Sequence, residues 1–278
     1  MKKITRRSFL AAAGLTAAAL ALTACGGSSS STASSTASSA ASSEAASSSA
    51  AAELTTVEAG KLTMATNAAF PPYEMTTDTG AFEGIDVDTA QAIAEKLGLE
   101  LQIDDMDFDA ALLSVQQGKA DIVMAGVTVT DERKAVMDFS DSYATGIQSI
   151  IVPEGSDIAT PDDLAGKKIG TQRGTTGYIY CSDDFGDENV VAYDNGLTAV
   201  QALTNGQVDA VVIDNAPAKE FVAANPGLVI LDTSYAEEDY AIGMAKGSAL
   251  EDAINATLEE LKADGTLQSI VDKYITAE

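Results

Sequence analysis

From Leu54 onward, short apolar runs of the kind that form buried strands alternate with stretches in which apolar residues recur every three or four positions, as on one face of a helix. The first run, Lys61–Thr66, predicts a strand. A helix should follow, begun by Asp86 or Asp88 and ended by Gly98. Alternation of this kind is typical of α/β folds with mostly parallel sheets.

The same arrangement occurs twice. The segments ALLSVQQGKADIVMAGVT and AVQALTNGQVDAVVIDNAP each contain a helical stretch, a glycine, an aspartate and an apolar strand. The glycines are Gly118 and Gly206, and the strands end at Gly126 and Asp214. Because the offsets match, we interpret the chain as two similar α/β lobes rather than as a chance likeness of two segments.

Polar or aromatic side chains follow four of the predicted strands. They occupy Asn67–Phe70, Gly126–Arg133, Gln172–Thr176 and Asp214. In open α/β sheets, ligands bind beyond the carboxyl ends of the strands. Two lobes that face each other would therefore bring all four segments to one cleft.

An amphipathic pattern near the C-terminus predicts a final helix. Ser248 and Glu251 have the spacing of a capping box at its start, and Gly265 should end it. Its apolar face carries Leu250, Ile254, Leu258 and Leu261. We expect this helix to return to the first lobe.

The N-terminal region has the pattern of an export signal. Lys2, Lys3, Arg6 and Arg7 precede an Ala/Leu-rich stretch that is too short and too weakly flanked for a stable membrane span. We interpret residues 1–24 as a signal peptide. The segment TRRSFL also resembles a twin-arginine signal, and an ordinary secretion signal with adjacent arginines by chance is the alternative.

The end of this stretch predicts a lipid anchor. LTAC, which ends at Cys25, resembles the lipobox of bacterial lipoproteins, in which the cysteine is acylated and becomes the new N-terminus. Residues 25–53 are almost all Ser, Ala, Thr and Gly, so we expect a flexible tether that spans roughly 30 Å as a random coil. The predicted location is the outer face of a bacterial cytoplasmic membrane, extracellular or periplasmic.

Composition excludes several function classes. The chain has 16 Lys and Arg against 42 Asp and Glu, so it should repel phosphate backbones and nucleic acid is not an expected partner. It contains no histidine, which removes Ser-His-Asp triads and histidine-based metal sites. With Cys25 acylated, Cys181 has no partner for an intramolecular disulfide, and we expect a small buried thiol. We predict no catalytic residue, no metal site and no cofactor.

Several motifs, in order, resemble the amino-acid-binding members of the type 3 extracellular solute-binding proteins, the receptors that feed ABC importers. They are ATNAAFPPYE, FEGIDVDTAQAIAEKLG, AGVTVTDERKAVMDFSDSY, IGTQRGTTG and GQVDAVVIDNAPA, and the resemblance covers about Lys61 to Tyr274. It implies a two-lobed, periplasmic-binding-protein-like (type II) α/β fold. Two hinge strands, near Ile147–Val152 and Ala236–Ile242, would join the lobes. The expected lobes are residues 54–148 with 241–278, and residues 149–240.

The resemblance also implies how the backbone groups of an amino acid would be held. Arg133, in the TVTDER motif, would pair with the α-carboxylate, which matches the guanidinium fork. Thr128 would add a hydroxyl and a backbone N–H, and Thr176 would reach the same carboxylate from the second lobe. Asp214 would take the α-ammonium, helped by the carbonyl of Gly126.

The remaining implied contacts surround the ligand's side chain. Phe70 and Phe108 would wall its pocket, and Asn67, Ala125 and Gln172 occupy positions that often touch the side chain. Many members that bind cationic amino acids have aspartate where this chain has Asn67. The expected ligand is therefore a polar amino acid, with a neutral one such as glutamine ahead of acidic or basic ones.

Each of these residues also has a structural interpretation. Arg133 could form a surface ion pair with Asp131, Glu132 or Asp138, and Asp214 could cap a helix begun near Pro217. The GTT hydroxyls could cap a helix that starts at Gly177, with Thr175 better placed than Thr176. Phe70 and Phe108 could be ordinary core residues.

The predicted function is a monomeric binding lipoprotein that closes over a free amino acid and delivers it to the permease subunits of an ABC importer. It is not expected to be an enzyme. The alternatives are a small-carboxylic-acid dehydratase on the same fold, with Glu74 or Asp214 as general acid, and a ligand-sensing module. A receptor that presents its cargo to some other partner is a third possibility.

Overall fold

The structure is a computed structural model that describes residues 54–275. The predicted signal peptide, the lipidation site Cys25 and the linker up to residue 53 lie outside the described residues. Within residues 54–275, no helix has both the length and the apolar character needed to cross a membrane.

The first lobe is built on a five-stranded sheet in the order β5-β1-β6-β14-β7. β1 runs parallel to β5 and β6, whereas β14 is antiparallel to β6 and β7. A small antiparallel sheet, β2-β3-β4, lies beside it. The strands are β1 (Lys61–Thr66), β2 (Ala69–Phe70), β3 (Glu74–Thr76), β4 (Phe82–Glu83), β5 (Glu100–Asp105), β6 (Ile122–Val123), β7 (Met137–Phe139) and β14 (Gly243–Ala245). The helices are α1 (Ile85–Leu97), α2 (Phe108–Gln116), α3 (Asp131–Val136), α7 (Glu251–Ala263) and α8 (Thr266–Tyr274).

The second lobe is built on a six-stranded sheet in the order β10-β9-β11-β8-β12, with β13 also paired to β8. β10, β9 and β11 are parallel, and β8 is antiparallel to β11, β12 and β13. The strands are β8 (Ala144–Pro153), β9 (Ile169–Gln172), β10 (Val190–Tyr193), β11 (Ala210–Asp214), β12 (Leu228–Ile230) and β13 (Ala236–Tyr240). The helices are α4 (Thr176–Phe185), α5 (Gly196–Thr204), α6 (Asn215–Ala224) and two 3₁₀ turns, η1 (Pro161–Leu164) and η2 (Asp187–Asn189).

Each sheet has helices on both faces because its strands are apolar on both sides. In β1, Leu62 and Met64 face the cluster that includes α1 and α7, while Ala65 faces the cluster of α2. In β11, Val211 packs toward α5 and Val212 toward α4. Alternate side chains of one strand therefore pack into two different apolar cores, one on each face of the sheet. This is why these strands are continuous apolar runs.

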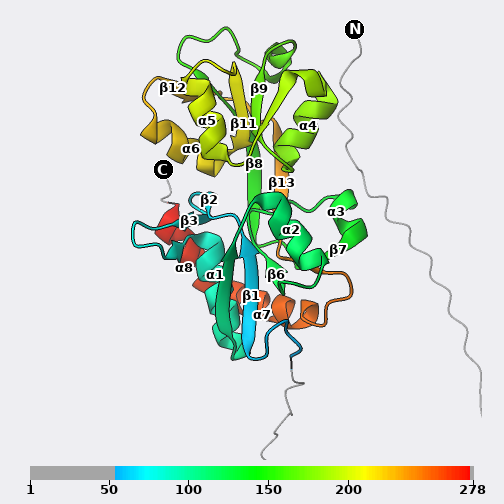
Figure 1. The fold of residues 1–278 in the computed structure, drawn as a ribbon. Helices are drawn as coiled ribbons and strands as arrows, with labels where there is room; N and C mark the ends of the chain where they lie inside the picture. Colours follow the sequence, from blue (N-terminus) through cyan, green and yellow to red (C-terminus); the bar gives the residue numbers. More distant parts are fainter. Residues whose placement is uncertain (1–53, 276–278) are drawn as a thin grey trace, which may run out of the picture. The chain divides into compact units, whose positions relative to one another are not determined.

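Two strands connect the lobes. β8 and β13 pair antiparallel from Ala144↔Tyr240 to Gln148↔Ala236, and they run between the two sheets (Figure 1). The predicted lobe boundaries, 148/149 and 240/241, fall inside β8 and directly after β13. Those boundaries stay a prediction. Most strands of each sheet run in one direction, as expected, and the sheets are mixed because β14 in the first and β8 in the second run against their neighbours.

Two predicted helix starts are wrong. α1 begins at Ile85, after Gly84, and the carboxylate of Asp86 bonds Gly126 N and the Tyr143 hydroxyl instead of capping the helix. At α7, the residue at the N-cap position is Leu250, and its N–H donates to the Ser248 hydroxyl, so the expected capping box is not formed.

The predicted last helix is also not the last one. α7 ends at Ala263 and is followed by α8. Gly265 adopts a left-handed conformation, φ 80°, which lets the chain change direction between the two helices. Both helices pack on α1, so the C-terminal segment returns to the first lobe as expected.

Cys181 lies in the core of the second lobe, as expected for a small buried thiol. It belongs to the apolar cluster of Ile150, Val152 and Ile169, and it is a free cysteine. Burial raises the pKa of its thiol to about 12. A neutral thiol of this kind is unreactive.

The crossing strands approach each other closely at Gly146. A Cβ built there would lie 2.5 Å from Cε1 and Cζ of Tyr240, which is fully buried and cannot withdraw. We predict that Gly146→Ala lowers the free energy of unfolding by about 1–3 kcal/mol, as overpacking does. Urea denaturation checks this, with the exposed neighbour substitution Thr145→Ala as control. Equal stability of the two variants would show that the ring has room to move.

Candidate functional site

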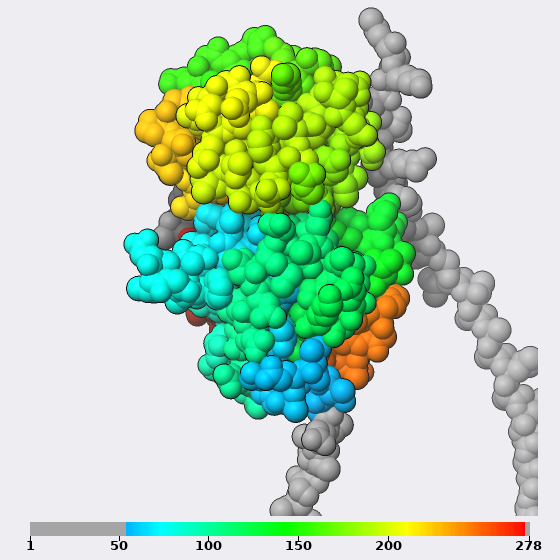
Figure 2. Space-filling model, in the orientation of Figure 1, coloured from blue at the N-terminus to red at the C-terminus, as the bar shows by residue number. Residues whose placement is uncertain are grey.

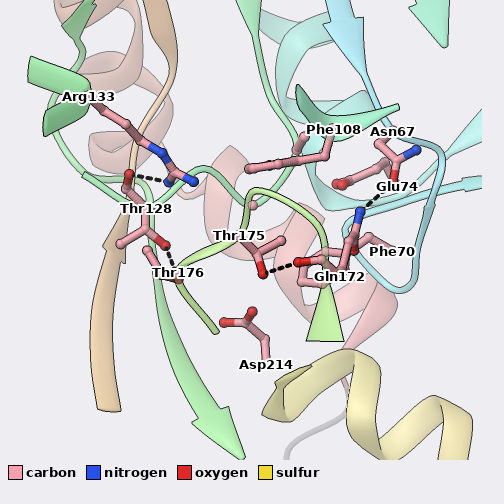
Figure 3. Close-up of a pocket in the computed structure, with 12 residues that line it drawn as sticks. Asn67, Phe70, Glu74, Phe108, Thr128, Arg133, Gln172, Thr175, Thr176 and Asp214 are labelled. Carbon is pink, nitrogen blue, oxygen red and sulfur yellow. Dashed lines mark hydrogen bonds between the residues drawn. The ribbon is translucent and has the colours of Figure 1, made fainter. Parts of the chain in front are cut away.

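All ten residues expected to contact the ligand line one cavity between the two lobes (Figure 3). The cavity is also lined by Glu74 and Thr175. It measures about 20 Å³, which is about the space that one water molecule needs. Figure 2 shows the atoms of the two lobes in close contact along their boundary on this side. Anything larger than a water molecule can enter only if the lobes separate.

Arg133 forms the cationic side of the cavity. It lies in the first turn of α3, where the hydroxyl of Thr130 caps the helix by accepting a hydrogen bond from Arg133 N. Its side chain is only 8% exposed and donates from Nη1 to the Thr128 carbonyl at 2.7 Å and from Nη2 to the Gly174 carbonyl at 3.2 Å. The guanidinium carbon lies 5.3 Å from the centre of the Phe108 ring.

This position rules out the surface ion pair considered for Arg133. The guanidinium is buried, and Asp138 pairs with Lys246 instead. Burial lowers the pKa of Arg133, and the charge of Glu238 acts in the opposite direction. A guanidinium remains charged under such a shift, so the cavity holds a buried cation. Phe108 packs in the first lobe's core and also forms the wall under this cation.

Two threonines meet across the cavity beside Arg133. The hydroxyl oxygens of Thr128 and Thr176 lie 3.5 Å apart, and both residues are buried. Helix α4 begins at Thr176, one residue before the expected start, and Thr175 caps it by accepting from Tyr178 N. Thr175 is therefore the capping residue, and Thr176 is left with its hydroxyl in the cavity.

Asp214 forms the anionic side. It is the last residue of β11 and is 7% exposed. Its carboxylate makes no capping bond to α6, and instead accepts hydrogen bonds from the Tyr240 hydroxyl and, at 2.8 Å, from Gln148 Nε2. Both donors come from the crossing strands. Burial raises the pKa of Asp214 to about 7, and the nearby charge of Glu238 adds to the rise.

Gly126 and Phe70 shape the floor of the cavity. Gly126 has φ +56°, and a Cβ there would lie 2.8 Å from Phe70 Cε1, so the close approach requires glycine. Its N–H donates to the Asp86 carboxylate at 3.0 Å. Ala125 precedes it and is buried in the α2 core. The Gly126 backbone is thus held by a buried carboxylate from α1.

At the far end, a chain of amides joins the lobes. Gln172 Nε2 donates to Asn67 Oδ1 at 2.9 Å, and Asn67 Nδ2 donates to the Met106 carbonyl at 2.9 Å. The first bond links the end of β9 to the end of β1 (Figure 3). These amides can both donate and accept, so they suit a polar group.

Sequence reasoning missed Glu74 as part of this end, having considered it only as a general acid. Glu74 is fully buried and lines the cavity, and neither of its carboxyl oxygens has a hydrogen-bond partner among the described residues. Burial raises the pKa of Glu74 well above its usual range, and the negative charges of Asp86 and Asp214 raise it further. The available signal was a lone acid in FPPYE, two residues after two prolines, in an apolar loop at a strand end.

Comparison with known proteins agrees with this geometry. The family model for bacterial extracellular solute-binding proteins, family 3, matches residues 62–277. The chain belongs to this family. The predicted membership and the two-lobed α/β fold are thereby confirmed, and the comparisons give no support to the dehydratase alternative.

Similar proteins cover most of the chain. The probable histidine-binding protein of Neisseria gonorrhoeae is 34% identical over 77% of this chain and 83% of its own length. The arginine-binding extracellular protein ArtP of Bacillus subtilis is 32% identical over 78% of this chain and 87% of its own. A solved structure of an ancestral arginine-binding protein bound to glutamine has a TM-score of 0.75 at 42% identity, and covers 78% of this chain and 99% of that one.

The buried Asp214 predicts a pH-dependent stability. Its folded pKa of about 7 lies above the unfolded value of about 3.9, so the folded protein keeps a proton that the unfolded chain loses. This contribution to stability is fully present below about pH 4 and is lost as the pH rises through about 7. Asp214→Asn should therefore reduce the fall in the free energy of unfolding between pH 4 and 8 by about 2–4 kcal/mol.

Urea denaturation at several pH values measures this fall in stability. Asp78→Asn, in an exposed loop, is the matched control and should keep the wild-type slope. If the slope for Asp214→Asn equals that of the wild type, the carboxyl does not retain its proton in the folded state.

Proposed function

We propose that this protein is the receptor of an ABC importer, that it captures a free polar amino acid between its lobes, and that it delivers it to membrane permease subunits. The observation that carries the proposal is the pair of buried, opposite charges on the walls of one cavity, Arg133 and Asp214. A zwitterion carries the complementary pair of charges. The relatives named above bind amino acids by their descriptions, which supports the same function here.

The carboxylate half of the ligand would lie at Arg133. The guanidinium Nη2 bonds the Gly174 carbonyl, a neutral acceptor that an incoming carboxylate can replace with a stronger, charge-assisted bond. Thr128 and Thr176 place one hydroxyl from each lobe at the same point. Contacts from both lobes to one carboxylate would stabilise the closed form by differential affinity.

The ammonium half would lie at Asp214. Its carboxylate is oriented by Tyr240 and Gln148, and the carbonyl of Gly126 lines the same cavity. An ammonium group beside Asp214 would favour the ionised carboxylate and remove its proton. Such a group needs several acceptors, since it has three donors and no acceptor.

The part of the cavity that would hold the ligand's side chain favours a cation. Phe70 and Phe108 supply apolar walls, while Asn67, Gln172 and Glu74 supply polar ends, with Ala125 leaving space between them. A guanidinium beside Glu74 would favour its ionised form, whose two carboxylate oxygens match the two parallel N–H groups of that guanidinium. We therefore propose arginine as the first candidate, and glutamine, which the neutral Asn67 favours, as the second.

Binding would require a hinge motion. The Gln172–Asn67 and Arg133–Gly174 bonds join the lobes across the cavity, and they must break to admit a ligand. β8 and β13 are the strands about which the lobes could rotate. We propose that the closed, loaded receptor docks on the permease, and that a separate cytoplasmic subunit hydrolyses ATP.

The location follows from the N-terminal sequence. Membership in an extracellular solute-binding family agrees with export. We propose that residues 1–24 are a signal peptide, that Cys25 carries lipid on the outer face of the cytoplasmic membrane, and that the segment up to residue 53 is a tether. We further propose that the protein acts as a monomer, binds no nucleic acid, and performs no catalysis.

The first test concerns Arg133. In isothermal titration calorimetry against the common amino acids, the wild type should bind one or a few of them, and Arg133→Ala should weaken that binding by at least about a hundredfold, as loss of a buried bidentate partner does. Arg173→Ala removes a neighbouring exposed arginine and should keep wild-type affinity. Near-normal affinity in Arg133→Ala would refute the carboxylate assignment.

The second test concerns the ligand's side chain. Glu74→Gln keeps the shape of the side chain but cannot ionise beside a cation, so it should weaken arginine binding by at least about tenfold and change glutamine binding far less. Competition calorimetry with both ligands measures the ratio. Glu95→Gln, on the exposed face of α1, is the control. Tighter wild-type binding of glutamine than of arginine would reject the cation proposal and leave the receptor function in place.

A further inference from the structure

Glu238 is a buried carboxylate beside the cavity, although it does not line it. It lies on the crossing strand β13 and is 6% exposed, whereas its neighbour Glu237 is exposed. Its charge acts on the buried guanidinium of Arg133 and raises the pKa of that group. Since buried carboxylates are normally paired, its position requires an explanation.

The hydrogen bonds of Glu238 reach both halves of the proposed site. Its Oε2 accepts from the Thr128 hydroxyl at 3.1 Å and from Gln148 Nε2 at 3.0 Å. The same Gln148 nitrogen donates to Asp214 Oδ2 at 2.8 Å, so one amide bridges the two carboxylates. Glu238 Oε1 is buried and has no hydrogen-bond partner among the described residues.

This arrangement places a negative charge next to the group that would hold the ligand's carboxylate. Thr128 has one hydroxyl proton, and Glu238 already accepts it. A carboxylate that pairs with Arg133 and arrives at Thr128 therefore also meets a like charge in a buried environment, and like-charge contacts of this kind are unfavourable. A ligand that also brings an ammonium to Asp214 offsets this repulsion, because only the side-chain amide of Gln148 separates Asp214 from Glu238.

We propose that Glu238 is a specificity-determining residue that makes the α-ammonium of the ligand obligatory. The site would thereby take α-amino acids and reject the corresponding carboxylic acids that lack the amino group. This inference rests on the proposed function, since it uses the assignment of Thr128 and Asp214 to the two ends of the ligand. The role differs from that of Asp214, which would contact the ammonium itself.

Removal of the Glu238 charge should affect the two kinds of ligand differently. For a zwitterion, the attraction of Glu238 to the ammonium and its repulsion of the carboxylate nearly cancel. For a simple carboxylate, only the repulsion remains. Glu238→Gln should therefore raise the affinity for the carboxylate much more than that for the amino acid.

The experiment is calorimetry on the full chain with arginine and 5-guanidinopentanoate, and with glutamine and 4-carbamoylbutanoate. The readout is the ratio of dissociation constants, carboxylic acid over amino acid, for the pair whose amino acid binds more tightly. In Glu238→Gln this ratio should fall at least about tenfold below the wild-type ratio. Glu237→Gln, with the same charge change on the exposed side of β13, should keep the wild-type ratio.

Glu238→Asp separates charge from shape, because it keeps the carboxylate and should keep the ratio within about threefold of the wild type. A wild-type ratio in Glu238→Gln, or an equal fall in Glu238→Asp, would overturn the proposal. If Glu238→Gln does not fold, as judged by circular dichroism, Glu238→Ala takes its place: a fall of at least about tenfold in the ratio supports the proposal, and a wild-type ratio overturns it. A wild type that binds no amino acid at all would instead refute the proposed function.

Discussion

The structure depends on the burial of opposite charges at the junction of two lobes. Arg133 and Asp214 are each more than nine-tenths buried, and the desolvation of such groups costs several kcal/mol unless hydrogen bonds replace water. The protein supplies those bonds locally, from backbone carbonyls to Arg133 and from Tyr240 and Gln148 to Asp214. Both groups therefore remain available to a zwitterion, whose ammonium would favour the ionised form of Asp214.

The crossing strands connect this chemistry to movement. Gln148 on β8, and Glu238 and Tyr240 on β13, orient Asp214 and Thr128, so the strands about which the lobes can rotate also hold the site's polar groups. Side chains two residues apart on β13 point to the same face, which explains why Glu238 and Tyr240 act together. A ligand that contacts both the Arg133 side and the Asp214 side would consequently favour the closed arrangement of the two lobes.

Sequence reasoning was most successful where the local pattern and the family motifs agreed. The strand Lys61–Thr66, the repeated lobe and the gathering of the expected strand ends around one cavity all appear in the structure. It failed where a polar residue had two possible partners. Asp86 has the sequence position of a helix cap but bonds Gly126 and Tyr143, and Ser248 with Glu251 has the spacing of a capping box that does not form.

The alternation of strands and helices, the burial of the strands and the types of residue at the strand ends could be predicted from the chain, because they follow from the period of apolar residues and from short motifs. Two features could not be read from the chain: the full burial of Glu74 at the cavity, and the amide that bridges Asp214 and Glu238. Both depend on groups far apart in the chain, whose distances are set only when the lobes pack.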